Sequence, residues 1–347
     1  MSDPNRRPPR AAIVDVTGTV LSDAERALFE AYPPYGFILF RRNCQTPEGV
    51  RALIASLRAC VGRDDAPVLI DQEGGRVQRL GPPVWRGAPA AANFGRLYAK
   101  DPVAGLEAAR LNAHLIASEL SDLGVTVNCA PVLDLSLPGA HDVIGDRAFG
   151  GDPDAVASLA DAFAEGLREG GVIPVIKHIP GHGRAMVDSH HDCPVVQASG
   201  AELRAMDFRP FQKFAGRGGD RAWAMTAHIV YQALDTERPA TISAAVIGDF
   251  VRGEIGFDGV LLSDDLSMQA LNGDAAERCG AALAAGCDLA LHCNGTLEER
   301  KAVLTTVPAV SSETLARLAR CDHAMPPPAA FDRAAATARL DHLLNAA

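Results

Sequence analysis

Eight short runs of β-branched and other apolar residues, separated by segments of helix length, predict an α/β protein built as a single (β/α)8 barrel of TIM type. The intervening segments, such as 106–123 and 153–169, repeat apolar residues at spacings of three and four, as amphipathic helices do. No Gly-x-Gly-x-x-Gly motif follows the first run, which disfavours the alternative of two Rossmann-like domains. A chain of 347 residues has room for all the strand-helix units in one barrel.

The predicted strands are short, and most of them end at a polar or charged residue. They cover residues 12–14, 36–40, 67–70, 125–127, 172–176, 223–226, 259–262 and 288–291. Longer loops at 81–94 and 135–152 interrupt the alternation, and loops of that size in a compact domain tend to be functional. We expect residues 1–10 to form a flexible tail and 11–347 a single catalytic domain, with a helical appendage near 334–344.

Composition limits the classes of partner. The chain is 48% apolar with a net charge of −10, and no segment supplies the clustered Lys and Arg that nucleic acid or an anionic membrane would require. The first ten residues are polar and lack the apolar core of a signal peptide, so we expect a cytoplasmic protein. We also expect it to act as a monomer. Eight dispersed cysteines without C-x-x-C spacing predict free thiols, and we expect neither metal nor cofactor.

Charged and polar side chains gather where five of the predicted strands end. They are Asp71, Glu73 and Arg79 after the third strand, Asp134, Asp146 and Arg147 after the fourth, Lys177, His178, His182, Asp188 and His190 after the fifth, His228 after the sixth, and Asp264 and Asp265 after the seventh.

Each of these groups has a structural explanation when it is taken alone. Asp264 and Asp265 could cap a helix, Asp146 and Arg147 could form a surface ion pair, and His228 could be a buried core histidine. In a barrel, however, all these strand ends point into one mouth, where unpaired buried charges are costly unless a ligand or partner offsets the cost. The joint pattern therefore predicts the functional site at this mouth.

The residues at the strand ends resemble the motifs of glycoside hydrolase family 3. They are Asp-Gln-Glu-Gly-Gly-Arg at 71–76, Ile-Gly-Asp-Arg-Ala-Phe-Gly at 144–150, Lys-His-Ile-Pro-Gly-His-Gly at 177–183, Asp-Ser-His at 188–190 and Ser-Asp-Asp-Leu-Ser-Met at 263–268. The likeness runs from about residue 14 to residue 294. The Asp-Ser-His triplet resembles the bacterial β-N-acetylglucosaminidases of cell-wall recycling rather than the β-glucosidases of the family.

This resemblance implies a function and a set of roles. It implies a cytoplasmic β-N-acetylhexosaminidase that releases N-acetylglucosamine from GlcNAc-β-1,4-anhydro-muramoyl peptides in peptidoglycan recycling, and so serves cell-wall biogenesis, cell division and cell shape. It implies Asp264 as the nucleophile, His190 as the general acid/base and Asp188 as the partner of that histidine. The residues that it implies hold the sugar are Asp71, Arg79, Arg147, Lys177 and His178. The chain departs from the family at Ile179, where the family often has Phe, and at His-Asp-Cys 191–193, where less polar residues are usual. These departures bear on the shape of the site on the aglycone side.

The chemistry of these residue types agrees with such roles. Retaining glycoside cleavage needs a carboxylate on one face of the anomeric carbon and a proton donor on the leaving-group side. Asp264 offers the carboxylate. A histidine with an ordinary pKa of about 6.5 can give a proton to the departing oxygen and then take one from water. Asp188, two residues before His190, can orient the imidazole and stabilise its charged form.

Three alternatives differ in chemistry. His178, His182, His190 and Asp188 could instead bind a divalent metal, although the first strand ends in Asp-Val-Thr at 15–17 and lacks a His-x-His motif. A sugar-binding barrel without activity is disfavoured because the nucleophile and acid positions are both filled. A phosphorylase remains open, because a neutral histidine repels phosphate less than a carboxylate does.

Overall fold

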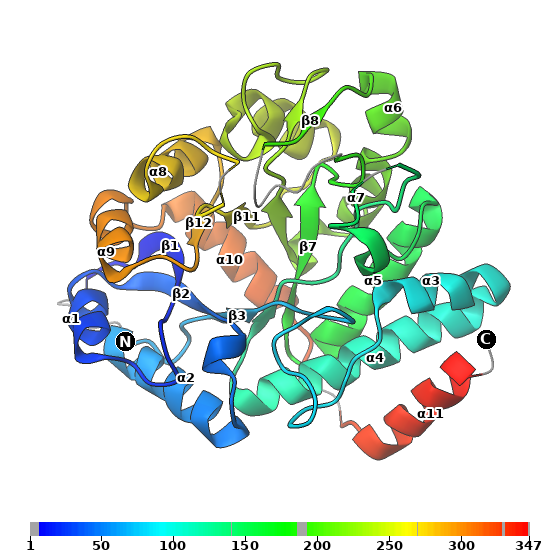
Figure 1. Ribbon diagram of the computed structural model, residues 1–347, viewed down its shortest axis with the longest axis horizontal. Coiled ribbons are helices and arrows are strands. Elements are labelled where there is room, and N and C mark those ends of the chain that lie inside the picture. The colour runs from blue at the N-terminus through cyan, green and yellow to red at the C-terminus, as the bar shows by residue number, and fades with distance from the viewer. Residues whose placement is uncertain (1–6, 140, 186–192, 269, 328–329, 346–347) are drawn as a thin grey trace.

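Eight parallel strands close into a barrel in the computed structural model, which describes residues 7–139, 141–185, 193–268, 270–327 and 330–345 (Figure 1). Each strand pairs with its neighbours in the chain, and the first strand pairs with the last. The predicted fold class and all eight predicted strand positions are confirmed. In chain order the barrel strands are β1 (Arg10–Asp15), β2 (Pro34–Leu39), β3 (Val68–Ile70), β6 (Val127–Asn128), β7 (Ile173–Ile179), β9 (Trp223–Thr226), β11 (Leu261–Asp265) and β12 (Leu289–His292).

Helices surround this barrel and confirm the predicted helical segments 106–123 and 153–169. They are α1 (Asp23–Ala31), α2 (Pro47–Val61), α3 (Ala91–Lys100), α4 (Pro102–Leu123), α5 (Pro153–Glu169), α6 (Gly200–Ala205), α7 (Phe208–Ala215), the π-helix η5 (Val246–Glu254), α8 (Ala275–Ala285), α9 (Leu297–Thr306), α10 (Ser312–Ala324) and α11 (Arg333–Asn345). The shorter elements are the 3-10 turns η1 (Arg41–Asn43), η2 (Gly145–Arg147), η3 (Gly219–Arg221) and η4 (Ala240–Ile242), and the strands β4 (Gln72–Gly74), β5 (Val77–Gln78), β8 (Val195–Val196) and β10 (Val230–Tyr231). None of the described helices is long and apolar enough to cross a bilayer.

The predicted loop at 81–94 is wrong at its C-terminal end, because α3 begins at Ala91. This helix buries Phe94 and Leu97, and Gly95 lies against the loop that follows β6. A Cβ at Gly95 would meet the carbonyl oxygen of Phe149 at 1.6 Å, so only glycine permits this approach. The helix α3 therefore packs closely against the loop after β6 at Phe149.

Two apolar layers follow from the alternation of side chains along the strands. Ala12 and Val14 of β1 face the helices, whereas Ala11 and Ile13 face the inside of the barrel. The helix α10 adds Leu318 and Cys321 to the inner layer and closes the end of the barrel opposite the carboxyl ends of the strands. Figure 1 shows α10 crossing behind the ring of strands. The other end of the barrel is left for polar side chains.

A buried ion network ties the seam where β1 meets β12. Arg300, whose side chain is 3% exposed, donates from Nε to Asp15 Oδ1 and from Nη1 to Glu25 Oε1, both at 3.0 Å. Its Nη2 donates to the carbonyl oxygen of Gly295 at 2.8 Å and to the hydroxyl of Thr17 at 3.1 Å. One side chain thus joins the loops after the first and last strands of the barrel.

Arg300→Met should lower the free energy of unfolding by about 3–5 kcal/mol, because it leaves the buried carboxylate of Glu25 without its cation and takes from Asp15 one of its two, Arg42 being the other. The matched control is Arg339→Met, which removes the exposed pair between Arg339 and Glu107 and should cost at most about 1 kcal/mol. Urea titration followed by circular dichroism measures both. Equal losses in the two variants would show that the seam does not depend on this network.

Candidate active site

A cavity of about 310 Å³ opens at the carboxyl ends of the barrel strands. Its volume lies at the small end of the range of about 300–1,000 Å³ that is usual for ligand pockets, which suits a ligand about the size of one sugar ring. The acidic, basic and histidine side chains that line it are Asp71, Glu73, Arg79, Arg147, Lys177, His178, His182, Asp264 and Asp265.

Two local distortions bring neighbouring residues into the same cavity. Successive side chains of a regular strand point to opposite faces, yet Lys177 and His178 of β7 both line the cavity. The register between β7 and β9 shifts between Lys177 and Ile179, as at a β-bulge. The register of β11 against β12 shifts in the same way before Asp265.

The hairpin of β4 and β5 carries one carboxylate and presents Arg79. The amide of Gln72 organises this turn, because its Oε1 accepts from the backbone N–H groups of Arg79 and Leu80 at 2.9 and 3.0 Å. Gly74 has a φ of +104°, and a Cβ there would meet the carbonyl oxygen of Pro89 at 2.3 Å. The hairpin therefore packs tightly and fixes Glu73 at the cavity wall.

Glu73 bridges two cations in the wall of the cavity. Its carboxylate accepts from Nε and Nη2 of Arg147, both at 2.8 Å, and lies 2.6 Å from Nζ of Lys177. Lys177 also donates to Asp71 at 3.1 Å, and Asp71 accepts from Nη2 of Arg79 at 2.9 Å. Three cations and two carboxylates thus form one continuous chain of ion pairs.

These contacts keep the buried charges ionised. Burial by itself would raise the pKa of Glu73, but Arg147 and Lys177 lower it to about 2. Burial likewise opposes the charge on Asp71, and Lys177 and Arg79 hold its pKa well below the usual range. Lys177 is 3% exposed, and although burial lowers its pKa, Glu73 and Asp71 raise it above its ordinary value. At neutral pH the chain of ion pairs presents fixed donors and acceptors to a ligand.

Asp134 orients the histidines that follow Lys177. Its Oδ2 lies 2.6 Å from Nδ1 of His178, and its Oδ1 accepts from the backbone N–H groups of His178 and His182 at 3.1 and 2.7 Å. Burial raises the pKa of Asp134, but the charge and hydrogen bond of His178 outweigh burial and hold that pKa at about 2. An ionised Asp134 can only accept a hydrogen bond, so Nδ1 of His178 carries the proton that it donates to this carboxylate. Nε2 is the ring nitrogen of His178 that Asp134 does not contact.

The adjacent carboxylates Asp264 and Asp265 differ in their surroundings. Burial raises the pKa of Asp264, but His178 and His228 lower it by more than burial raises it, so the pKa lies below its ordinary value. Burial raises the pKa of Asp265 to about 6, and its oxygens accept from the backbone N–H of Ser267 at 2.9 Å, from the Ser267 hydroxyl at 2.8 Å and from the N–H of Cys293 at 3.0 Å. Of these two neighbours, Asp264 is therefore the one that is ionised at neutral pH, whereas Asp265 ties the loop after β11 to the end of β12.

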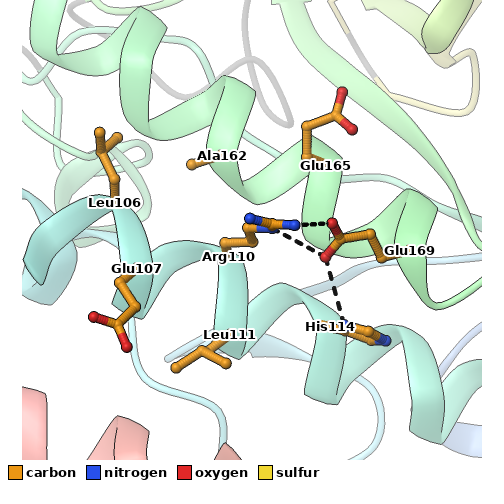
Figure 2. Close-up of a pocket in the computed structure, with 8 residues that line it drawn as sticks. All are labelled: Leu106, Glu107, Arg110, Leu111, His114, Ala162, Glu165 and Glu169. Carbon is orange, nitrogen blue, oxygen red and sulfur yellow. Dashed lines mark hydrogen bonds and ion pairs between the residues drawn. The ribbon is translucent and has the colours of Figure 1, made fainter. Parts of the chain in front are cut away.

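A second and larger cavity, of about 610 Å³, lies on the flank between α4 and α5 (Figure 2). Arg110 and Glu169 form an ion pair there, and Nδ1 of His114 lies 3.6 Å from Glu169. Figure 2 shows these three side chains turned toward one another, in the outer helical layer. Since it lies away from the strand ends, we do not assign the reaction to this cavity.

Six of the predicted site residues come together in the cavity at the strand ends. They are Asp71, Arg79, Arg147, Lys177, His178 and Asp264. The other two, Asp188 and His190, lie outside the described residues. Within the described part of the chain, no group of three or more His, Cys, Asp or Glu side chains is arranged to hold a metal ion.

The sequence prediction placed Glu73 and Asp134 at strand ends but gave neither of them a role in the site. Nothing in their spacing indicated that Glu73 bridges Lys177 and Arg147. Nor did it indicate that Asp134 accepts hydrogen bonds from the backbone of both His178 and His182. The suggested surface pair of Asp146 with Arg147 is also wrong. Asp146 pairs with Arg76 at 3.0 Å, and Arg147 turns inward to Glu73.

The closed barrel and its cation-rich mouth around an ionised carboxylate define an enzyme of the (β/α)8 barrel class. Residues 14–321 match the family model described as "Glycosyl hydrolase family 3 N terminal domain". The chain therefore belongs to glycoside hydrolase family 3, as the resemblance of its motifs predicted.

Named relatives agree with this assignment. A β-hexosaminidase of Alkalilimnicola ehrlichii is 42% identical over 312 residues, which cover 88% of this chain and 87% of that protein. A solved family 3 β-N-acetylglucosaminidase from Paenibacillus sp. aligns with a TM-score of 0.83 and 32% identity, over 96% of this chain but 66% of that one. NagZ from Neisseria gonorrhoeae, solved with N-trifluoroacetyl-D-glucosamine, aligns with a TM-score of 0.84 and 32% identity over 98% of both chains.

Glu73→Gln should destabilise the protein by about 3 kcal/mol at pH 7, because Lys177 and Arg147 lose their shared counter-charge. The folded pKa of Glu73, about 2, lies below its ordinary value of 4.5, so its contribution is complete above about pH 4.5 and is lost as the pH falls toward 2. Between about pH 4.5 and 3 the wild type should therefore lose stability more steeply than the variant. Urea titrations across this range measure the slopes.

The control for this prediction is Glu48→Gln, which removes a carboxylate that is 80% exposed and 3.5 Å from Arg51. It should change stability by less than about 1 kcal/mol. A Glu73→Gln protein with the wild-type dependence on pH would mean that this carboxylate does not hold the two cations in solution.

Proposed function

We propose that this protein is a retaining exo-β-N-acetylglucosaminidase that releases terminal N-acetylglucosamine from peptidoglycan fragments. The observation that carries the proposal is the ionised carboxylate of Asp264, which lies in a small cavity whose wall is a chain of fixed donors and acceptors. The names of the β-hexosaminidase and β-N-acetylglucosaminidase relatives, and the N-acylglucosamine derivative bound by the Neisseria protein, support the class of substrate.

In this proposal Asp264 attacks the anomeric carbon and forms a covalent glycosyl-enzyme. A carboxylate with a lowered pKa is ionised at neutral pH and ready to attack. The leaving-group oxygen takes a proton from His190, and the bond from the sugar to that oxygen breaks. His190 then removes a proton from water, whose oxygen attacks the same carbon and releases Asp264 as a carboxylate.

Asp188 would hold the imidazole of His190 and stabilise its protonated form, as the aspartate of a catalytic triad does. In the sequence both residues fall between the cavity residue His182 and β8, outside the described residues. A histidine acid/base is compatible with phosphate as the acceptor in place of water, and the assay below separates the two.

The terminal sugar would be held by the polar wall of the cavity. The proposed binding residues are Asp71, Arg79, Arg147, Lys177 and His178. Glu73 neutralises part of the positive charge of this wall, which favours an uncharged, hydroxyl-bearing ligand over an anion. We assign no cofactor to the reaction.

The proposed substrate is N-acetylglucosamine β-1,4-linked to an anhydro-muramoyl sugar with or without its peptide. The enzyme would act on it in the cytoplasm as a monomer, with residues 11–347 as one catalytic unit, and would serve peptidoglycan recycling and thereby cell-wall biogenesis, cell division and cell shape.

Asp264→Ala should abolish turnover, whereas Asp265→Ala should mainly reduce stability, because Asp265 is engaged by Ser267 and Cys293. A slow fluorinated N-acetylglucosaminide should leave its sugar on Asp264 of the wild type, located by peptide mass spectrometry. Rapid turnover with no labelled aspartate would instead favour attack by the acetamido group of the substrate.

His190→Ala should slow substrates with poor leaving groups at least about 100-fold, and activated aryl glycosides far less, because an activated phenol needs little protonation to depart. Asp188→Asn should lower the rate without unfolding the protein, as checked by circular dichroism. Equal losses of His190→Ala on both kinds of substrate would remove this residue from the acid/base role.

Purified muropeptide should yield free N-acetylglucosamine, and aryl N-acetyl-β-glucosaminide should be cleaved much faster than aryl β-glucoside. Chromatography of the products, with and without phosphate, distinguishes hydrolysis from formation of a sugar phosphate. Fast cleavage of β-glucosides with an intact muropeptide would contradict the proposed substrate.

A further inference from the structure

A fully buried polar chain lies behind the end of β11. Its members are Thr226 of β9, His228 two residues later and Thr241 of η4, each at most 1% exposed. The hydroxyl oxygens of Thr226 and Thr241 are 2.8 Å apart, and Thr241 Oγ1 is 2.7 Å from Nδ1 of His228. The other ring nitrogen, Nε2, is 3.0 Å from the carbonyl oxygen of Asp265.

The direction of each hydrogen bond follows from what each atom can donate. A carbonyl oxygen only accepts, so Nε2 of His228 carries the proton that it donates to Asp265. Burial lowers the pKa of His228, so the ring is neutral and its Nδ1 accepts. Thr241 then donates its single hydroxyl hydrogen to Nδ1 at 2.7 Å rather than to the carbonyl oxygen of Ala227 at 3.1 Å, and Thr226 donates to Thr241.

The two ends of this chain hold the backbone on both sides of the proposed nucleophile. The N–H of Asp264 donates to the hydroxyl oxygen of Thr226 at 3.3 Å, and the carbonyl oxygen of Asp265 accepts from His228 at 3.0 Å. The carboxylate Oδ1 of Asp264 accepts from the N–H of Asp265 at 2.8 Å, inside the same clamped segment. The direction of the Asp264 carboxylate is therefore set by the peptide unit between Asp264 and Asp265. The polar chain holds the backbone on both sides of this peptide unit, at the N–H of Asp264 and the carbonyl oxygen of Asp265.

Stability alone gives a weak reason for such a chain. Apolar side chains of the same shape would fill the space between β9, β11 and η4 without the cost of desolvating two hydroxyls and an imidazole. A hydrogen-bonded chain fixes orientation more closely than apolar packing does, and reacting groups need placement within about 0.5 Å.

We propose that His228 and Thr241 are positioning residues for Asp264, acting as a directional chain from Thr226 through Thr241 and His228 to the carbonyl oxygen of Asp265. The inference rests on the proposed role of Asp264 as nucleophile. Neither residue lines the cavity, so the chain is expected to affect attack on the anomeric carbon and not the binding of the sugar.

The test compares Thr241→Val, which keeps the shape and removes the hydroxyl, with Thr241→Ser, which keeps the hydroxyl. Thr241→Val should lower the rate at which the fluorinated glycoside labels Asp264 by about 10- to 100-fold, while Thr241→Ser stays within about threefold of the wild type. Calorimetry should find the affinity of both variants for N-acetylglucosamine within about twofold of the wild type.

Nitrogen-15 NMR of histidine-labelled wild type reads the proton positions directly, in the protein without a substitution in this chain. The His228 signal, assigned as the one missing from His228→Gln, should show a protonated Nε2 and an unprotonated Nδ1. A proton on Nδ1, or a Thr241→Val protein that labels Asp264 at the wild-type rate, would overturn the positioning role. Labelling of the wild type at another residue, or none, would instead overturn the proposed nucleophile.

Discussion

The bridge that Glu73 makes between Lys177 and Arg147 is the contact on which the rest of the site depends. Both cations are almost fully buried, and neither would remain stably charged there without a carboxylate beside it. Asp71 completes the compensation by pairing with Lys177 and Arg79. The barrel mouth can therefore hold many charges in a small volume without a bound ligand, and its donors are in place before a ligand arrives.

Asp264 and Asp265 are adjacent in the chain and chemically identical, but their contacts at the barrel mouth give them different properties. Asp265 is surrounded by donors from its own loop and from β12, and it serves the local structure. Asp264 faces the cavity, and its low pKa depends on His178 and His228. His178 is in turn oriented by Asp134, so a carboxylate that never lines the cavity affects the charge of one that does.

Much of this arrangement could be predicted from the sequence, because apolar runs mark strands and the ends of parallel strands share one mouth. The eight strands and six of the site residues followed from that rule together with the family resemblance. Pairing inside the mouth could not be predicted. The register shifts at Lys177 and before Asp265 turn consecutive residues into one cavity, and strand periodicity predicts the opposite. The start of α3 was also missed, because its burial depends on contact with a distant loop at Phe149.

The central claim is that the sugar is displaced twice at the anomeric carbon, first with formation of an intermediate and then by water, so that the configuration of this carbon is retained. Proton NMR of the first seconds of hydrolysis of an aryl N-acetyl-β-glucosaminide, before the free sugar mutarotates, tests this claim most directly. The account predicts that the β-anomer of N-acetylglucosamine appears first and the α-anomer only later. Initial release of the α-anomer would mean a single displacement by water, and Asp264 would then not be the nucleophile.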